Sequence, residues 1–186
     1  VPGEGGLDAQ AMANGGVDVL FNLGADEIEI GGGPFVVYIG SHGDRGAHRA
    51  NVILPAAAYT EKSGTYVNTE GRVQRSDRAN FPPGDAREDW AILRALSDVI
   101  GQRLPFDSLN ALRAALVAAH PHMGALDAIA SGDAASLSKI PAGTLGNKPF
   151  VNAVQDFYLT NPIARASAVM AECSALAKGR LAQAAE

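Results

Sequence analysis

The sequence predicts an α/β fold in which part of a Rossmann-like parallel sheet is followed by a mainly helical C-terminal region. Three short apolar runs, each closed by a loop that carries glycine or proline, indicate buried parallel strands near the N-terminus. Beyond residue 80 the apolar residues recur at helical spacing instead. A chain of 186 residues, 47% hydrophobic and 19% charged, is long and apolar enough to bury a core.

The predicted strands are Val17–Leu23, Phe35–Ile39 and Val52–Leu54. Since Val52–Leu54 is continuously apolar and is followed by Pro55, which cannot donate a backbone hydrogen bond, we expect a core strand buried on both faces. The ligands of such sheets bind beyond the carboxyl ends of the strands. The loops at Gly24 and Gly40 are therefore the places to search for a cofactor.

A turn and a second pair of extended segments follow. Glu61–Gly64 has turn chemistry, and we expect Gly64 to adopt positive φ before Thr65–Val67 resumes a strand. The polar residues around this turn are expected to close a loop through hydrogen bonds, to which a Glu–Arg pair could contribute. These residues are Glu61, Thr65, Asn68, Glu70 and Arg72.

Two helices are predicted after Gly84. Asp85 and Glu88 form a capping-box pattern for the first, which ends at Gly101. Asp107 or Ser108 can cap the second, and Pro121 ends it. Their apolar positions are Trp90, Leu93, Leu96 and Ile100 in the first helix, and Leu109, Leu112 and Leu116 in the second.

The C-terminal third predicts a loop-rich excursion and then a helix. Residues 122–155 are rich in Gly, Ala, Ser and Asp, with one short helix expected near Leu126–Ile129. Thr160-Asn161-Pro162 begins a further helix, which could pack on its own domain or on another subunit. Its apolar face is Ile163, Ala166, Met170, Cys173, Ala177 and Leu181. The predicted regions are the sheet domain (1–80), a helical region (81–121), the excursion (122–155) and a C-terminal docking helix (156–186).

Composition excludes several classes of function. A net charge of −5 with scattered arginines argues against nucleic-acid binding. No apolar run approaches the roughly 20 residues that span a bilayer, so direct membrane insertion is not expected. Val1-Pro2-Gly3 lacks the features of a signal peptide and is expected to begin a chain cut from a longer one. Cys173 is the only cysteine, which cannot ligate an iron–sulfur cluster from this segment alone.

No catalytic, cofactor-binding or metal-binding residue is predicted within this segment. His42, Asp44 and His48 lie close in sequence, but no fourth ligand is near them, and a polar loop is favoured over a metal site. The glycines of Gly31–Gly33 and Gly40–Gly43 do not form a dinucleotide-binding fingerprint and favour turns. His120 and His122 are expected at a helix end without a catalytic role, and Cys173 on an apolar helix face.

Two stretches carry a family resemblance. Ala50–Gln74, which includes Lys62-Ser-Gly-Thr-Tyr-Val-Asn-Thr-Glu-Gly-Arg72, resembles the molybdopterin oxidoreductase superfamily. Gly71 and the match on both sides make it most similar to the large iron–sulfur subunit family of respiratory NADH:quinone oxidoreductase, complex I. Asp156–Cys173 resembles the tail of the same subunit family. The resemblance covers nearly all of this chain but only the C-terminal portion of the family's chains.

The resemblance implies a scaffold in a translocating oxidoreductase, whose 2Fe–2S and 4Fe–4S clusters lie upstream of this segment. Cofactor-bearing relatives carry a Gly-Glu-Asn-Pro-like turn where this chain has Gly24-Ala-Asp-Glu27, and two carboxylates there would repel a pyrophosphate. Asn51 replaces the family's usual aspartate. The implied partners are other peripheral-arm subunits, on the cytoplasmic side of a bacterial inner membrane or the mitochondrial matrix side. The alternative is a fragment of an active molybdopterin enzyme such as a formate dehydrogenase.

Overall fold

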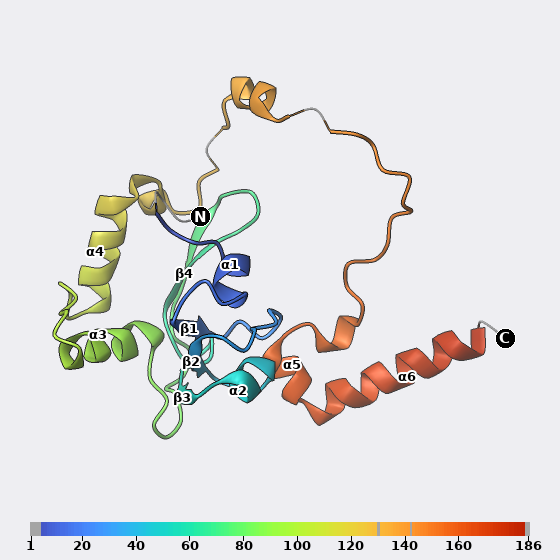
Figure 1. Cartoon of the computed structure of the whole chain (residues 1–186), viewed down its shortest axis with the longest axis horizontal. Coiled ribbons are helices and arrows are strands. Elements are labelled where there is room, and N and C mark those ends of the chain that lie inside the picture. Colours follow the sequence, from blue (N-terminus) through green and yellow to red (C-terminus); the bar gives the residue numbers. More distant parts are fainter. Residues whose placement is uncertain (1–4, 130, 142, 185–186) are drawn as a thin grey trace. The chain divides into compact units, whose positions relative to one another are not determined.

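The computed structural model describes residues 5–129, 131–141 and 143–184, with side chains as far as residue 179. The chain forms two compact units, whose helices and strands are drawn in Figure 1. The first comprises Val1–Ala56, Gly84–Ala86 and Val151–Glu186, and the second comprises Ala57–Pro83 and Arg87–Phe150. The elements of the first unit are α1 (Ala9–Ala13), β1 (Val19–Leu23), β2 (Phe35–Gly40), α2 (Arg45–Arg49), β3 (Val52–Pro55), η3 (Phe157–Leu159), α5 (Pro162–Ala166) and α6 (Ala168–Ala184). Those of the second are β4 (Gly64–Val67), β5 (Val73–Ser76), α3 (Asp89–Val99), α4 (Leu109–Ala119), η1 (Pro121–Gly124) and η2 (Ala134–Lys139).

A three-stranded parallel sheet forms the centre of the first unit. Its strand order is β1-β2-β3, and the register places Phe21 opposite Val37 and Val37 opposite Val52. Helix α2 lies in the connection from β2 to β3, as parallel strands require a crossover. The predicted α/β class is confirmed, since this sheet is followed by a mainly helical C-terminal region.

The core lies on the central strand. Val36, Tyr38 and Ile39 of β2 are at most 2% exposed. The prediction that Val52–Leu54 is buried on both faces is wrong, because Val52 and Ile53 are 40% and 56% exposed. Among the described strands, β3 has a neighbour on one side only, so an apolar run that is typical of a core strand forms a sheet edge here.

Asn51 sets the start of the pairing between β2 and β3. Its side-chain oxygen accepts a hydrogen bond from the Val36 amide at 2.8 Å, and its own amide donates to the Val36 carbonyl at 2.8 Å. A carboxamide oxygen is a sufficient acceptor for this purpose. The position therefore functions here without the negative charge that an aspartate would bring.

The second unit contains an antiparallel hairpin of β4 and β5. In its loop, the Asn68 side-chain oxygen accepts from the amides of Glu70 and Arg72, each at 3.0 Å, and Glu70 pairs with Arg72 at 3.5 Å. The predicted loop closure by polar side chains is confirmed for Asn68, Glu70 and Arg72. The prediction of positive φ at Gly64 is wrong, since Gly64 begins β4 in extended pairing, and the left-handed residue is Gly71, with φ of +82°.

Helices α3 and α4 follow the predicted pattern with one correction. The capping box of Asp85 and Glu88 is wrong: Glu88 itself stands at the N-cap of α3 without a capping side-chain bond, and its carboxylate instead accepts from the Trp90 indole at 2.6 Å. Gly101 follows α3 as expected, and Ser108, rather than Asp107, caps α4.

The short helix expected near Leu126–Ile129 is absent. Leu126 forms a bridge with Val73, and the Asp127 amide donates to the Val73 carbonyl at 2.8 Å, with φ of 57° at Asp127. These contacts take the place of a local helix, because the carbonyl at the start of β5 accepts the Asp127 amide.

The C-terminal helix begins where predicted but is not continuous. The Asn161 side chain accepts from the Ala164 amide at 2.9 Å and starts α5 at Pro162, whereas extended backbone at Ser167 separates α5 from α6. The prediction of one uninterrupted apolar face is therefore wrong. Met170, Cys173 and Ala177 of that face are half-buried, Ile163 is 39% exposed, and Leu181 lies outside the described side chains. Among the described residues, no helix has the length and apolar character needed to cross a membrane.

Candidate functional site

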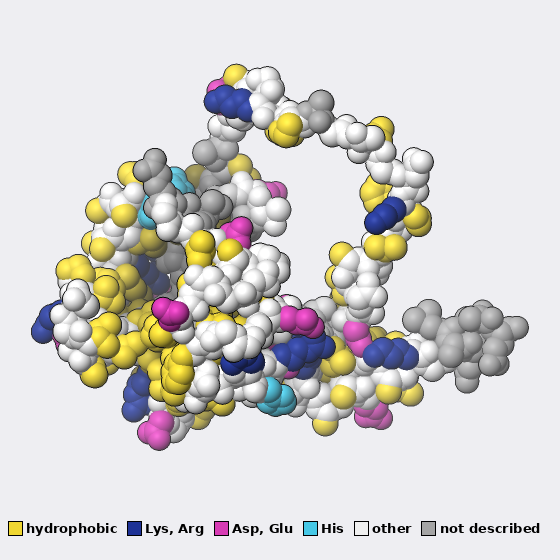
Figure 2. Space-filling model, in the orientation of Figure 1, with side chains coloured by type: hydrophobic (Ala, Val, Ile, Leu, Met, Phe, Trp, Pro, Cys, Tyr) yellow, Lys and Arg dark blue, Asp and Glu magenta, His cyan; other side chains and the backbone are white. Residues whose placement is uncertain are grey.

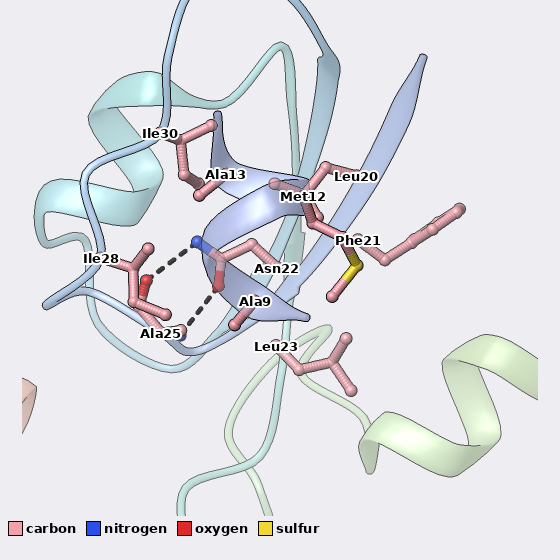
Figure 3. A pocket seen from close by; sticks show the side chains of 10 residues that line it. All are labelled: Ala9, Met12, Ala13, Leu20, Phe21, Asn22, Leu23, Ala25, Ile28 and Ile30. Carbon is pink, nitrogen blue, oxygen red and sulfur yellow. Dashed lines mark hydrogen bonds between the residues drawn. The ribbon is translucent and has the colours of Figure 1, made fainter. Parts of the chain in front are cut away.

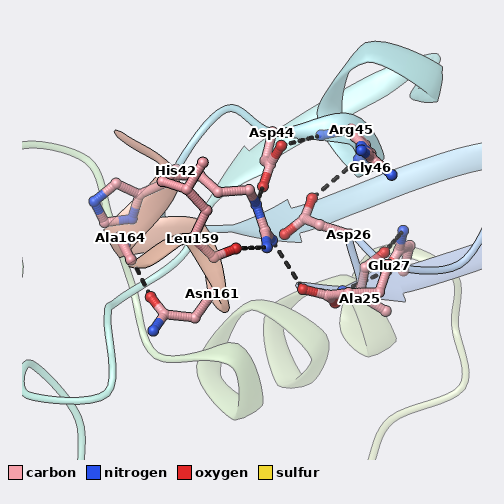
Figure 4. Close-up of polar contacts among 12 residues, drawn as sticks. Ala25, Asp26, Glu27, His42, Asp44, Arg45, Gly46, Leu159, Asn161 and Ala164 are labelled. Carbon is pink, nitrogen blue, oxygen red and sulfur yellow. Dashed lines mark hydrogen bonds and ion pairs between the residues drawn. The ribbon is translucent and has the colours of Figure 1, made fainter. Parts of the chain in front are cut away.

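The candidate site lies at the carboxyl ends of β1 and β2, where an open parallel sheet binds its ligands (Figure 4). The turn after β1 is held by Asn22, whose side chain donates to the Ala25 carbonyl and accepts from the Ala25 amide, both at 2.9 Å. Gly24 within this turn has φ of +65°, which glycine adopts without strain. The turn therefore orients the two acidic residues that follow.

Asp26 points into the unit. It is 2% exposed, and its carboxylate accepts from the Gly46 amide at 3.0 Å and from the Tyr38 hydroxyl at 3.2 Å. The Tyr38 hydroxyl also lies 3.1 Å from the His42 carbonyl. Burial, together with the nearby Asp26 charge, raises the pKa of Tyr38 to about 12. Asp26 is thus a buried acceptor that ties β2 and α2 to the turn after β1.

Glu27 and Asp44 hold a guanidinium from the C-terminal segment. Arg165 of α5 donates from Nε to Asp44 and from Nη2 to Glu27, the latter at 2.8 Å. Its Nη1 donates to the Leu159 carbonyl at 3.1 Å. The Arg165 and Asp44 side chains are 24% and 17% exposed, whereas Glu27 is 61% exposed. One side chain therefore joins the loops after β1 and β2 to the end of the chain.

The electrostatics of this contact stabilise the charged forms. Hydrogen bonding from Arg165 lowers the pKa of Glu27. Burial opposes ionisation of Asp44, but the bonds from Arg165 and the Arg45 amide leave the pKa of Asp44 below its ordinary value. Burial likewise opposes the charge of Arg165, and its two carboxylates raise the Arg165 pKa nonetheless. Carboxylates held in this way are weak bases near neutral pH and poorly suited to general acid–base catalysis.

A second anchor fixes α6 against η3. The Asp156 carboxylate accepts from the Tyr158 amide at 3.1 Å, from the Ser174 hydroxyl at 2.5 Å, and from Lys178 at 2.9 Å. Ser174 is 4% exposed, and its bond leads the interactions that lower the pKa of Asp156. The C-terminal segment thus has its own internal support beside the Arg165 contact.

The histidines and the cysteine do not assemble into a site. His42 Nδ1 lies 2.9 Å from the Ser41 hydroxyl, whereas the oxygens of Asp44 bond to Arg165 and the Arg45 amide. His48 lies in the last turn of α2, and the part of the chain that the structure describes contains no group of three or more potential metal ligands. Cys173 is half-buried on α6.

The glycine triplet serves chain packing. The Gly31 carbonyl accepts from Arg49 Nε at 3.0 Å and Nη2 at 2.6 Å, and Arg49 also donates to the Pro34 carbonyl at 3.1 Å. The Gly31 amide donates to the Ala13 carbonyl at 2.9 Å. Both backbone groups of Gly31 are therefore engaged by protein partners.

An apolar groove of about 190 Å³ lies along β1 (Figure 3). The large apolar side chains that line it are Met12 of α1, Leu20, Phe21 and Leu23 of β1, and Ile28 and Ile30. Its polar side chain, Asn22, has both amide atoms bonded to Ala25. The groove offers apolar contact without a free polar side chain to orient a ligand.

Sequence reasoning missed the residues that matter most at this end of the sheet. In the sequence, Asp26 resembles any acidic residue of a loop, and Tyr38 resembles any aromatic residue of a strand. Nothing local indicates their contact, because the two residues are 12 apart. Arg165 offered one signal, since it is the only charged residue from Asn161 to Ala171, a stretch otherwise of small and apolar side chains. A lone cation there indicates a specific acidic partner, although not which one.

Two family models match the chain. The first, molybdopterin oxidoreductase, matches residues 1–99, more than half of the chain. The chain belongs to the molybdopterin oxidoreductase family. The second describes the C-terminal region of the G-type subunit of NADH-ubiquinone oxidoreductase and matches residues 126–173. Within the family, this second match connects the chain with complex I, and its range includes both Asp156 and Arg165.

Similar proteins within the family carry matching names. The NADH-ubiquinone oxidoreductase 75 kDa subunit of Reclinomonas americana is 46% identical over 162 residues, which covers 86% of this chain and 23% of the relative. The mitochondrial NADH-ubiquinone oxidoreductase 78 kDa subunit of Neurospora crassa is 47% identical over 165 residues, which covers 84% of this chain and 22% of the relative. NADH dehydrogenase [ubiquinone] iron-sulfur protein 1, mitochondrial, of Solanum tuberosum is 47% identical over 163 residues, which covers 86% of this chain and 22% of the relative. The predicted resemblance to the C-terminal portion of this large subunit is confirmed, and the chain spans less than a quarter of these relatives' length.

Proposed function

We propose that this chain is a scaffold portion of the large iron–sulfur subunit of a proton-translocating NADH:quinone oxidoreductase. In this proposal the segment binds neither molybdopterin nor metal, and electrons pass from NADH toward quinone through 2Fe–2S and 4Fe–4S clusters elsewhere in the parent subunit. The observation that carries it is Arg165, which occupies the carboxyl end of the sheet between Asp44 and Glu27.

The residues at this end of the sheet do not fit a pyrophosphate-bearing cofactor. An anion is stabilised by free backbone N–H groups and by cations. Here the Gly46 amide already donates to buried Asp26, and the guanidinium of Arg165 is paired with two carboxylates. A pyrophosphate would have to displace Arg165 and would then face the negative charges of Glu27 and Asp44.

The names of the relatives support a proposed location and proposed partners. Two of them are called mitochondrial, and one is called an iron-sulfur protein. We place the segment in the peripheral arm of the complex, in contact with other peripheral-arm subunits. In mitochondria this arm would face the matrix, and in a bacterium the cytoplasm.

The testing experiment is elemental analysis of the purified, intact complex, combined with turnover measurements on the Arg165→Leu variant. We expect iron from clusters elsewhere, no stoichiometric molybdenum or tungsten, and normal NADH:quinone turnover per assembled variant complex. Stoichiometric molybdenum would contradict the scaffold role and favour the rival, an active molybdopterin oxidoreductase. Reduced turnover at normal assembly would assign Arg165 a role in electron transfer.

A further inference from the structure

The outer edge of β1 is unpaired among the residues that the structure describes, since β1 has only β2 beside it. The Phe35 amide of β2 donates to the Asp18 carbonyl at 2.8 Å, so the main-chain groups of Asp18 face β2. Because main-chain groups along a strand point alternately to its two sides, the N–H and C=O groups of Val19, Phe21 and Leu23 point outward. Within the described residues, these outward groups form no hydrogen bond.

This edge lacks the features that normally keep an exposed strand from pairing. Val19-Leu-Phe-Asn-Leu23 contains neither a charged residue nor a proline. Phe21 is 40% exposed, and it borders the apolar groove beside α1. In the space-filling view, hydrophobic side chains gather where β1 and β2 lie (Figure 2). All-parallel sheets are normally covered, so these properties are typical of a strand inside a sheet rather than at its edge.

Helices α1 and α2 lie on the same face of the sheet. Side chains of α1 line the groove together with Asn22 of β1, and Gly46 of α2 lies against the Tyr38 ring of β2. Asn22 and Tyr38 are register partners, so their side chains point to the same face. Gly31 joins the two helices there: its amide donates to the last carbonyl of α1 at 2.9 Å, and its carbonyl accepts from Arg49 of α2 at 3.0 Å.

The positions of these helices indicate where a further strand belongs. Helix α2 lies in the crossover from β2 to β3, and α1 directly precedes β1. A helix before a parallel strand normally belongs to a crossover from another strand of the same sheet. Crossovers are right-handed in almost all cases, so two crossovers with helices on one face step across the sheet in the same direction. The step from β2 to β3 leads away from β1, and a strand before α1 would therefore lie on the free side of β1.

We infer that a strand upstream of this segment, which precedes α1 in the parent subunit and is here called the preceding strand, pairs in parallel with the outer edge of β1. This inference rests on the proposed function, which makes the chain part of a longer subunit. The chain spans 22% to 23% of the relatives' length, and residues 126–173 match the C-terminal region of the G-type subunit. Most of a relative's chain therefore lies before the matched stretch and can supply the strand.

The groove specifies the side chains of the preceding strand. On the face that carries α1, these side chains lie beside Met12 and Leu20. They are apolar, because Asn22 has both amide atoms bonded to Ala25 and leaves no partner for a buried polar group. The main chain of the preceding strand bonds to the outward groups of β1, which would otherwise be covered without partners.

Site-specific photo-crosslinking in the intact complex tests the inference. A photoreactive phenylalanine analogue replaces Phe21 in one preparation and, as a control, Ile53 on β3 at the opposite edge of the sheet; these side chains are 40% and 56% exposed. We expect position 21 to crosslink to an apolar peptide of the same subunit upstream of this segment. The yield should be several-fold higher than from position 53, which lies three strand spacings, about 14 Å, from the preceding strand.

Three outcomes of the crosslinking would overturn the inference. These are crosslinks from position 21 to another subunit, crosslinks from it only within residues 1–186, and equal yields of the upstream peptide from positions 21 and 53. Each would show that something other than an upstream strand of the same subunit, or nothing, lies at the edge of β1.

Amide hydrogen exchange of the same complex supplies a second measurement. We expect the outward amides of Phe21 and Leu23 to exchange at least about a hundredfold more slowly than their intrinsic rates, as the Leu20 amide, which faces β2, should also do. Fast exchange at Phe21 and Leu23 with slow exchange at Leu20 would show a free edge and refute the inference. Neither measurement depends on metal content, so molybdenum in the complex would refute the scaffold role alone, whereas a free edge would refute only the preceding strand.

Discussion

Replacing Arg165 with leucine should release the C-terminal segment from the end of the sheet. The contact with Asp44 is the larger contribution, since both side chains are mostly shielded, at 24% and 17% exposure. A hydrogen bond to a charged group contributes roughly 1.5–3 kcal/mol, and an exposed pair such as that with Glu27 contributes at most about 1 kcal/mol. Because Asp44 keeps its bond to the Arg45 amide, we expect a net loss of about 2 kcal/mol, or about thirtyfold in the local opening equilibrium.

Amide hydrogen exchange of the assembled complex measures this opening. Exchange at residues 157–167 should accelerate by about thirtyfold in Arg165→Leu, with β1–β3 unaffected. Arg165→Lys keeps the charge without the planar fork and should give an intermediate rate. Arg103→Leu, which removes an arginine with 64% side-chain exposure from the second unit, is the matched control. Unchanged exchange at 157–167 in Arg165→Leu would refute the reasoning.

Acid should release the same contact. The folded-state pKa values of Asp44 and Glu27 are lowered, so the stability they contribute is fully present above their unfolded values of about 3.9 and 4.3. It is lost as pH falls through the folded-state values. We expect the protection of the amides at 157–167, relative to the intrinsic exchange rate at each pH, to persist at about pH 5 and to fall below about pH 4. Arg165→Leu should lack this transition; an equal acid response in that variant would contradict the assignment.

The remaining predictions concern internal packing and can be checked by denaturant unfolding. Tyr38→Phe leaves buried Asp26 short of a donor and should cost about 1–3 kcal/mol. The stability of the unmutated protein should also fall as pH rises from about 10, the pKa of an unfolded tyrosine, through about 12, the folded-state pKa of Tyr38. A similar alkaline loss in Tyr38→Phe would exclude Tyr38 as its source. Gly46→Ala places a methyl 2.7 Å from the Tyr38 ring and 2.9 Å from the Asp26 carboxylate, so it should destabilise the first unit. If the variant is as stable as the unmutated protein, the ring can move away and the packing argument is wrong. Gly71→Val forces a branched residue to positive φ and should cost about 1–3 kcal/mol. Gly64→Ala should cost less, because the atoms nearest to its methyl belong to the half-exposed Tyr66 ring, and the reverse order would contradict this account.

Local signals along the chain were sufficient for most elements. The strands at residues 19–23 and 35–40, the Ser108 cap and the helix start at Pro162 follow from apolar runs and capping side chains within a few residues. One error came where a distant group competed. Leu126 lies in a stretch with a helical pattern, but the Val73 backbone, far away in sequence, offers it a bridge instead.

The sequence by itself determined the α/β class, the family resemblance and the unfavourable charge of the Gly24–Glu27 turn, because periodicity, turn chemistry and charge are local properties. Only the tertiary structure decided which apolar strand lies in the core, since burial depends on neighbours: β2 has two and β3 has one. The tertiary structure also decided which residue the acidic side chain of the turn binds. Arg165 lies 138 residues from Glu27 and 121 from Asp44, and no local pattern specifies that three such distant side chains meet at one end of the sheet.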